Sequence, residues 1–466
     1  MQGCLNNYSI ESELRVENMK ELTSGKPTKV IILFAIPLMC GYIFQQLYNM
    51  ADGKIVSNYV GTAAFAAIGA TSVVSNTITA LINGMTQGFS IKVANSFGAR
   101  DYKNMRKYVA GTFILTAGFT LVLGVLAQIF IQDILLLLKT PADILPDAIA
   151  YVRIILGGIA FSSLYNMCAN LLRGVGDSKT PLYCLLASVI INIGLDLLFV
   201  NVFKWGIKGA AIATIMSQAM CGIACLLYMF FKFREMLPKK ESWKADKGQY
   251  PDLISTGLAM GLMSCIVNIG TVVLQGAINS LGTDTVAAHT AARRVFDILT
   301  VMLYTIGLAI TTFVSQNMGA GKTDRVRTGI RQAILLVTGI TTFLIVICFL
   351  FARPVLTWLA STDNPAIIDK AVMYTKISIC FFYVLGPLLV LRLALQGMGR
   401  KIIPVFTSVL EMLVKIISAS FLVPVLQYKG VAITEPISWC IMTTVLVISY
   451  LRHIPGKEEK KQQPQH

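Results

Sequence analysis

Two aspartates lie inside apolar stretches of the sequence, where an ionisable side chain needs a special reason. Asp52 lies in YNMADGKIV, and Asp196 ends the string NIGLD inside LLASVIINIGLDLLFVNVF. Asn192 precedes Asp196 by one turn of a helix, so both side chains lie on one face. Thr214 lies in the following apolar run, GIKGAAIATIMSQ. Carboxylate, amide and hydroxyl oxygens are the ligands that hard cations prefer, so these four residues together could bind Na⁺.

The sequence leaves two other interpretations of the aspartates open. Neighbouring carboxylates can share a proton, so the pair could take up H⁺ in place of Na⁺. Alternatively both aspartates have structural roles. In that case Asp52 lies in the membrane interface or pairs with Lys54, and Asp196 is a buried, hydrogen-bonded cap.

The elements that must position these residues are membrane-spanning helices. The chain has 466 residues, 55% hydrophobic and 14% charged, with a mean hydropathy of +0.67. This composition is too apolar for an ordinary soluble domain. Apolar stretches long enough to cross a ~30 Å hydrocarbon core fall near residues 30–58, 63–92, 108–136, 146–172, 181–203, 208–231, 251–280, 285–316, 328–352, 366–396, 402–426 and 430–451. The predicted fold is an all-α integral membrane protein with twelve transmembrane helices.

The candidate residues come to one depth in these spans. At a rise of ~1.5 Å per residue, Asp196 lies about 22 Å from the start of its span. Asp52 lies about 12 Å and Thr214 about 9 Å from the opposite membrane surface. A charge near the middle of a membrane helix costs about 2.5–3.5 kcal/mol, so such residues normally face a bundle interior or a cavity.

The formal net charge of +16 reports membrane topology. Lys and Arg collect in both terminal segments and in alternate loops, at residues 100–107, 173–179, 232–247, 322–331 and 400–401. This bias predicts that both termini lie in the cytoplasm and that the number of spans is even, and it argues against a nucleic-acid partner. The first 28 residues are polar and show no cleavable signal peptide, and Met19 is an alternative start.

An internal repeat organises the chain. YVGTAAFAAIGA from residue 59 reappears as SLGTDTVAAHTA from residue 280, which pairs Gly61 with Gly282. RGVGDSKTP from 173 matches QGMGRKIIP from 396, and GAAIATIMSQ from 209 matches GVAITEPISW from 430. We therefore expect two pseudo-symmetric six-helix lobes, an architecture found in secondary transporters. The predicted divisions are a cytoplasmic segment 1–28, an N-lobe 29–231, a basic linker 232–250, a C-lobe 251–452 and a charged tail 453–466.

Enzyme chemistry has no support in the sequence. GAGKT at 319–323 resembles the end of a phosphate-binding loop, but Gln316 stands where that motif needs glycine. The ten cysteines form no C-x-x-C pair, there is no H-E-x-x-H, and His289 is expected to pack or hydrogen bond inside a helix. No cofactor is expected.

The predicted C-lobe carries an unusual set of charges within its spans: Arg293, Arg294, Asp297, Arg392, Glu411, Lys415 and Glu435. Arg293 with Asp297, and Glu411 with Lys415, have i,i+4 spacing and can pair on one helix face. Two interpretations are possible: ion pairs that neutralise one another, or a substrate or second proton site.

The chain resembles the multidrug and toxic compound extrusion (MATE) transporters over residues 20–452. The strings that carry the resemblance are IPLMCGYIFQQLYNMADGKIVSNYVG, FAAIGA, LRGVGDSKTPL, NIGLDLLFV, GIKGAAIATIMSQ and VAAHTAARR. The resemblance implies a V-shaped cavity between two lobes and export of organic compounds, often cationic drugs, in exchange for Na⁺ or H⁺. The family's N-lobe cation site maps onto Asp52, Asn192, Asp196 and Thr214, with the Ala210 carbonyl as a further ligand. Pro37 falls at the family's hinge in the first helix, where a proline permits a bend.

The sequence departs from one branch of this family. The branch typified by NorM carries carboxylates in the seventh and tenth spans, where this chain reads CIVNIGTVVLQG and FYVLGPLLVLRLALQG. The resemblance is therefore closer to the DinF-like branch, and the coupling site is expected in the N-lobe. The expected location is a bacterial-type inner (plasma) membrane. Small organic substrates and the lipid bilayer are the expected partners of a monomer. The alternative function is a flippase for lipid-linked precursors.

Overall fold

A computed structural model describes residues 21–138, 140–244, 248–360 and 364–453. The possible start at Met19 and most of the predicted N-terminal segment and tail lie outside the described residues. Within the described residues every regular element is a helix. Ten helices are long and apolar enough to cross a membrane, and counting each of two bent helix pairs as one span gives twelve. The predicted all-α, twelve-span fold is confirmed.

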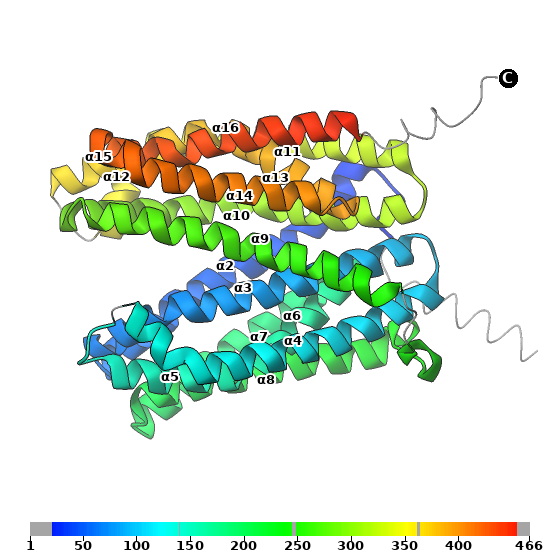
Figure 1. Ribbon diagram of the computed structural model, residues 1–466, viewed down its shortest axis with the longest axis horizontal. Helices are drawn as coiled ribbons and strands as arrows, with labels where there is room; N and C mark the ends of the chain where they lie inside the picture. Colours follow the sequence, from blue (N-terminus) through cyan, green and yellow to red (C-terminus); the bar gives the residue numbers. More distant parts are fainter. Residues whose placement is uncertain (1–20, 139, 245–247, 361–363, 454–466) are drawn as a thin grey trace, which may run out of the picture. The chain divides into compact units, whose positions relative to one another are not determined.

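The helices of the first half of the chain are α2 (Pro27–Tyr59), α3 (Thr62–Gly98), α4 (Tyr102–Leu137), α5 (Leu145–Gly157), α6 (Ile159–Gly174), α7 (Lys179–Asp196) and α8 (Gly206–Lys232). Those of the second half are α9 (Gln249–Asn279), α10 (Thr283–Gly319), α11 (Thr323–Ala360), α12 (Pro365–Cys380), α13 (Phe382–Gly397), α14 (Ile402–Ile417), α15 (Val423–Leu426) and α16 (Tyr428–Arg452). Figure 1 labels them along the chain. Short 3₁₀ turns at Arg234–Met236 and Lys240–Trp243 lie between α8 and α9.

Local sequence signals set several helix starts. The Asp101 side chain accepts a hydrogen bond from the Asn104 backbone N–H at 3.0 Å and caps α4. Gly61 and Gly282, the glycines paired by the repeat, precede α3 and α10 with φ of 118° and 93°. Glycine suits both positions because other residues rarely adopt such angles.

Two predicted single spans are in fact bent. The segment predicted at 146–172 is the pair α5 and α6, bent by 45°, and the one at 366–396 is the pair α12 and α13, bent by 53°. At the first bend, a Cβ on Gly158 would lie 2.5 Å from Ile215 of α8, so glycine allows a close helix approach there. Hydropathy is continuous across both bends, which is why composition did not reveal them.

The two halves repeat the same packing. In the first, α3 contacts α4, α5 and α6, and α8 contacts α5, α6 and α7. In the second, α10 contacts α11, α12 and α13, and α16 contacts α12, α13 and α14. Each half also places a π-helical segment after the equivalent helix, Leu197–Val202 after α7 and Ser418–Leu422 after α14. The packing therefore follows the sequence repeat.

The contacts divide the chain into two compact units whose boundaries lie inside helices. Among the described residues, unit 1 takes Glu21 and Cys40–Gly261, and unit 2 takes Leu22–Met39 and the chain from Leu262 onwards. The first part of α2 thus belongs to unit 2 and the first part of α9 to unit 1. This grouping differs from the predicted lobes 29–231 and 251–452, because a helix was assumed to belong wholly to one lobe.

Candidate functional site: a buried carboxylate pair

Asp196 is the last residue of α7 and is fully buried, at 0% exposure. The π-helical segment begins directly after it, and π-bulges are frequent at functional sites. With the Asn192 amide oriented to satisfy its hydrogen bonds, its nitrogen donates to Asp196 Oδ2 at 2.9 Å. Asn192 therefore holds one oxygen of Asp196, as their spacing of one helical turn predicted.

Asp52 comes from α2 and lies beside Asp196. The two carboxyl groups are close enough for a hydrogen bond between them. One oxygen of each, Asp52 Oδ1 and Asp196 Oδ1, is buried without a hydrogen-bond partner. Lys54, the alternative partner of Asp52, is exposed. A buried carboxylate oxygen without a partner is costly, so this pair is suited to a cation or a shared proton.

Thr214 of α8 brings a third helix to the site. Its backbone N–H donates to the Asn192 amide oxygen at 3.3 Å, and its hydroxyl donates to the Ala210 carbonyl at 3.0 Å. Asp52, Asn192, Asp196 and Thr214 therefore lie together within unit 1. Ala210 lies next to them, one helical turn before Thr214, and its side chain packs in the apolar core.

Two tyrosines that sequence reasoning missed complete the surroundings. Tyr48 lies beside Thr214 and interacts electrostatically with both aspartates. Tyr151 of α5 also interacts electrostatically with both aspartates. Tyr48 precedes Asp52 by four residues, so i,i+4 spacing could have found it. Tyr151 reaches the site only through tertiary packing.

The donor set fits a hard monovalent cation better than a transition metal. Two carboxylates, an amide and hydroxyls supply oxygen ligands, and no sulfur or imidazole takes part. Within the described ranges, no group of three or more His, Cys, Asp and Glu side chains is arranged to hold a metal ion. The same two carboxylates could equally hold a proton between them.

A polar cavity of about 190 Å³ adjoins this site within unit 1. Tyr48 and Asn192, which contact the carboxylate site, also line the cavity. The remaining lining residues are uncharged: Gln45, Thr79, Ser162, Tyr165, Asn166, Leu185, Ser188, Val189, Ser217, Gln218 and Cys221. Two residues are thus shared between the carboxylate site and this cavity.

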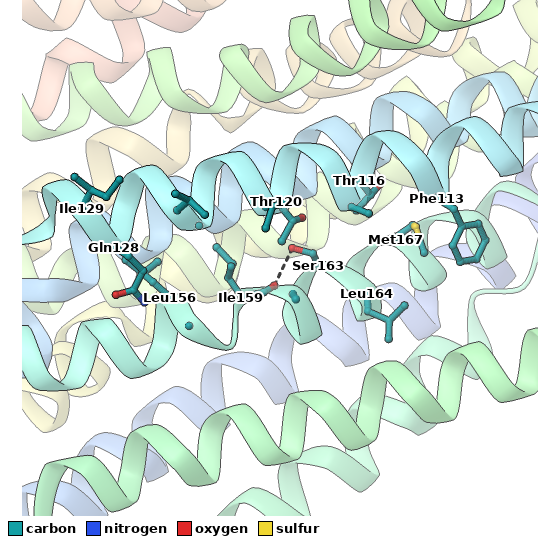
Figure 2. Close-up of a pocket in the computed structure, with 16 residues that line it drawn as sticks. Phe113, Thr116, Thr120, Gln128, Ile129, Leu156, Ile159, Ser163, Leu164 and Met167 are labelled. Carbon is teal, nitrogen blue, oxygen red and sulfur yellow. Dashed lines mark hydrogen bonds between the residues drawn. The ribbon is translucent and has the colours of Figure 1, made fainter. Parts of the chain in front are cut away.

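A larger and more apolar cavity of about 700 Å³ lies between α4 and the α5–α6 pair (Figure 2). Its lining contains no Asp, Glu, Lys, Arg or His. Thr116 and Thr120 line it with hydroxyls that have no partner, and Ser163 bonds to its own helix at Ile159. This cavity lacks the carboxylates, so it is separate from the predicted cation site.

The C-terminal charges of unit 2 form two groups. In the first, which we call the Arg293 cluster, Arg293 donates to Glu435 at 2.8 Å and to Asp297 at 2.9 Å. The Tyr374 hydroxyl lies 3.4 Å from the other Glu435 oxygen. His289 packs edge-on against Tyr374, as expected of a packing histidine.

In the second group, the Lys415 cluster, Lys415 donates to Glu411 at 2.9 Å and to Thr271 at 3.1 Å. Arg392 lies 3.6 Å from Glu411 and donates to Ser408. Lys415 also interacts electrostatically with Glu435 of the first cluster. The three positive and three negative side chains therefore neutralise one another, which favours the ion-pair interpretation.

A duplicated six-span bundle with ionisable side chains buried inside its spans defines the class of secondary transporters. Comparison with known proteins is more specific. The MatE family model matches residues 37–198 and 259–421, and the chain belongs to this family of multidrug efflux transporters, as its motifs predicted. Its relatives are transporters and not enzymes.

Individual relatives agree with this assignment. The chain is 31% identical to the probable multidrug resistance protein YpnP of Bacillus subtilis, covering 66% of this chain and 68% of that protein. It is 25% identical to the probable multidrug resistance protein YoeA of the same organism, covering 92% and 94%. Its fold matches a crystal structure of a MATE protein in the bent conformation with a TM-score of 0.87 at 22% identity, covering 96% of this chain and 99% of that one.

Proposed function

We propose that the protein exports organic, often cationic, compounds in exchange for Na⁺ or H⁺ that binds at Asp52 and Asp196. The observation that carries the proposal is the pair of buried, unpartnered carboxylate oxygens contributed by two helices. Leaving both carboxylates ionised side by side is unfavourable, so the site gains most when a cation neutralises it. Asn192, Thr214 and the Ala210 carbonyl supply the remaining oxygens of the proposed site.

Shared residues offer a route for coupling. Tyr48 and Asn192 contact the carboxylate site and also line the 190 Å³ cavity. A positively charged compound in this cavity is attracted by the two carboxylates, and that attraction falls when a cation neutralises them. Because coupling between two sites is reciprocal, substrate binding then weakens cation binding by the same factor. Cation entry from outside would release substrate, and cation loss to the cytoplasm would restore the substrate-binding state.

Pro37 is the proposed hinge for this alternation. It lies inside α2, which runs without interruption from Pro27 to Tyr59. The part of α2 up to Met39 belongs to unit 2 and the part from Cys40 to unit 1. Pro37 therefore lies where the helix changes its packing partners, and the backbone hydrogen bond it lacks makes bending there less costly.

The basic loops support an orientation with both termini in the cytoplasm, and the relatives support a bacterial plasma membrane. The N-lobe position of the carboxylate pair supports the DinF-like branch. We further propose that the protein works as a monomer, since each residue of the proposed site comes from the same unit of one chain.

Transport by purified protein in liposomes tests the proposal. Under an imposed Na⁺ or pH gradient, a fluorescent cationic dye should leave the compartment that corresponds to the cytoplasm. Asp196→Asn should abolish this gradient-driven movement. Asp133→Asn is the matched control, because it makes the same chemical change at an exposed position of α4. If Asp196→Asn transports as well as the control, the carboxylate pair is structural and the proposal is wrong.

A further inference from the structure

The repeat places two residues of the Arg293 cluster, Glu435 and Tyr374, opposite residues that surround the carboxylate pair of the first half. GAAIATIMSQ aligned with GVAITEPISW pairs Thr214 with Glu435. RGVGDSKTP and QGMGRKIIP are 223 residues apart. The same offset, applied to the bent pairs α5–α6 and α12–α13 that precede them, pairs Tyr151 with Tyr374. Each tyrosine approaches the acidic side chains of its own half. The two halves therefore use equivalent positions to surround a carboxylate.

The charges at these positions differ between the halves in a compensating way. The carboxylates of the first half have no acidic counterpart, since Val273 stands opposite Asp52 and Ala419 opposite Asp196 in the repeat. The second half instead gains Glu435. It also gains cations, because Arg293 stands opposite Ser72 and Lys415 stands opposite Asn192.

Of these cations, Arg293 binds the gained carboxylate of Glu435 directly. Arg293 Nη1 donates to Glu435 Oε1 at 2.8 Å, and Arg293 Nε donates to Asp297 Oδ1 at 2.9 Å. The Glu435 side chain is buried, and the guanidinium also lies 4.6 Å over the Phe296 ring. The positive group here is thus fixed by two carboxylates and an aromatic face, and it is covalently part of the chain.

We propose that Arg293 is a built-in cation that fills the C-lobe equivalent of the coupling site, so that only the N-lobe exchanges an ion with the medium. This inference rests on the proposed function of Asp52 and Asp196. A guanidinium that is part of the chain cannot dissociate to either side of the membrane. An ion gradient therefore cannot drive its exchange. The number of ions exchanged per cycle then depends on the N-lobe pair alone, and Arg293 is the residue that keeps an exchangeable ion from the C-lobe position.

Removing the guanidinium should expose a latent cation site. Arg293→Met leaves Glu435 and Asp297 without their shared partner, with Tyr374 beside them, and the neutral network of unit 2 becomes negative by one charge. An added cation or proton can restore neutrality. Arg293→Lys keeps a tethered charge and should not open the site.

Cation binding by purified full-length variants tests this inference. Radioactive sodium measures bound Na⁺, and a pH indicator measures protons taken up on acidification. In an Asp196→Asn background, Arg293→Met should add one cation equivalent per protein, and Arg293→Lys should add none. Adding Glu435→Gln to Arg293→Met should remove the extra equivalent. The inference is overturned if folded Arg293→Met takes up no additional cation.

A second variant covers the case in which Arg293→Met does not fold. Glu435→Gln alone, with Arg293 still held by Asp297, should leave the number of cations bound by the otherwise unchanged protein the same. A decrease would show that Glu435 binds an exchangeable ion and would overturn the inference. The proposed N-lobe function fails by a different result, unaltered cation binding in Asp196→Asn alone.

Discussion

In Asp196→Asn, the stability of the folded protein should no longer depend on the concentration of the coupling cation. The amide keeps the size of the carboxylate and can still accept the 2.9 Å hydrogen bond from Asn192. It also removes one of two adjacent buried charges, so the variant without cation should be at least as stable as the unchanged protein. What it should lose is the stabilisation that cation binding provides.

The size of that loss follows from linkage. A cation at 100 times its dissociation constant stabilises the folded state by about 2.7 kcal/mol. If the N-lobe unfolds as a unit of about 200 residues, this corresponds to roughly 5–10 °C in the melting temperature. The assay is thermal unfolding in detergent with Na⁺ replaced by choline, and separately across a pH series, with Asp133→Asn as control. A cation-dependent shift in Asp196→Asn equal to the control would refute the assignment.

Three further predictions concern the hinge, the bend and the C-lobe charges. Pro37→Ala should slow gradient-driven dye transport in liposomes while leaving the cation-dependent thermal shift intact; an unchanged rate would exclude Pro37 as the hinge. Gly158→Ala should destabilise by about 1–3 kcal/mol in thermal unfolding, because its Cβ would lie 2.5 Å from an α8 side chain, whereas Gly157→Ala, with its nearest atom at 3.5 Å, should be tolerated; equal stability of the two would contradict this. Lys415→Met should cost about 3–5 kcal/mol by leaving Glu411 short of a partner, and adding Glu411→Gln should recover much of that loss in the same measurement; two independent, additive losses would argue against the ion pair.

The parts of the site that the sequence predicted are those fixed by spacing along one helix. Asn192 and Asp196 meet because one turn of α7 separates them, and their common depth with Asp52 followed from the rise per residue. Tyr151 was missed because its contact with the carboxylates depends on how α5 packs, and a tyrosine in a span looks like any other amphipathic packing residue.

For the fold, too, the sequence predicted the features set by the apolar pattern and missed those set by tertiary contacts. Hydropathy predicted the number and order of spans, because each must cover the hydrocarbon core. It did not reveal the bend at Gly158, where glycine allows a close approach to Ile215 of α8. Nor did it show that α2 and α9 each divide between two units, since that division depends on tertiary contacts and not on the apolar pattern of either helix.

In the C-lobe, the sequence predicted the ion pairs within one helix but not those between helices. The i,i+4 pairs Arg293 with Asp297 and Glu411 with Lys415 were predicted and form. The link from Arg293 to Glu435 joins α10 to α16, and only the folded structure shows it.

The central claim is that substrate and cation move in opposite directions through exchange at the Asp52–Asp196 pair. The most direct measurement is cation movement driven by substrate alone. Proteoliposomes are loaded with dye and diluted into dye-free buffer without any ion gradient, while sodium uptake or internal pH is followed. The account predicts that outward dye movement drives Na⁺ or H⁺ inward in the unchanged protein and in Asp133→Asn, but not in Asp196→Asn. Dye efflux without any counter-movement of either cation, or equal counter-movement in Asp196→Asn, would contradict it.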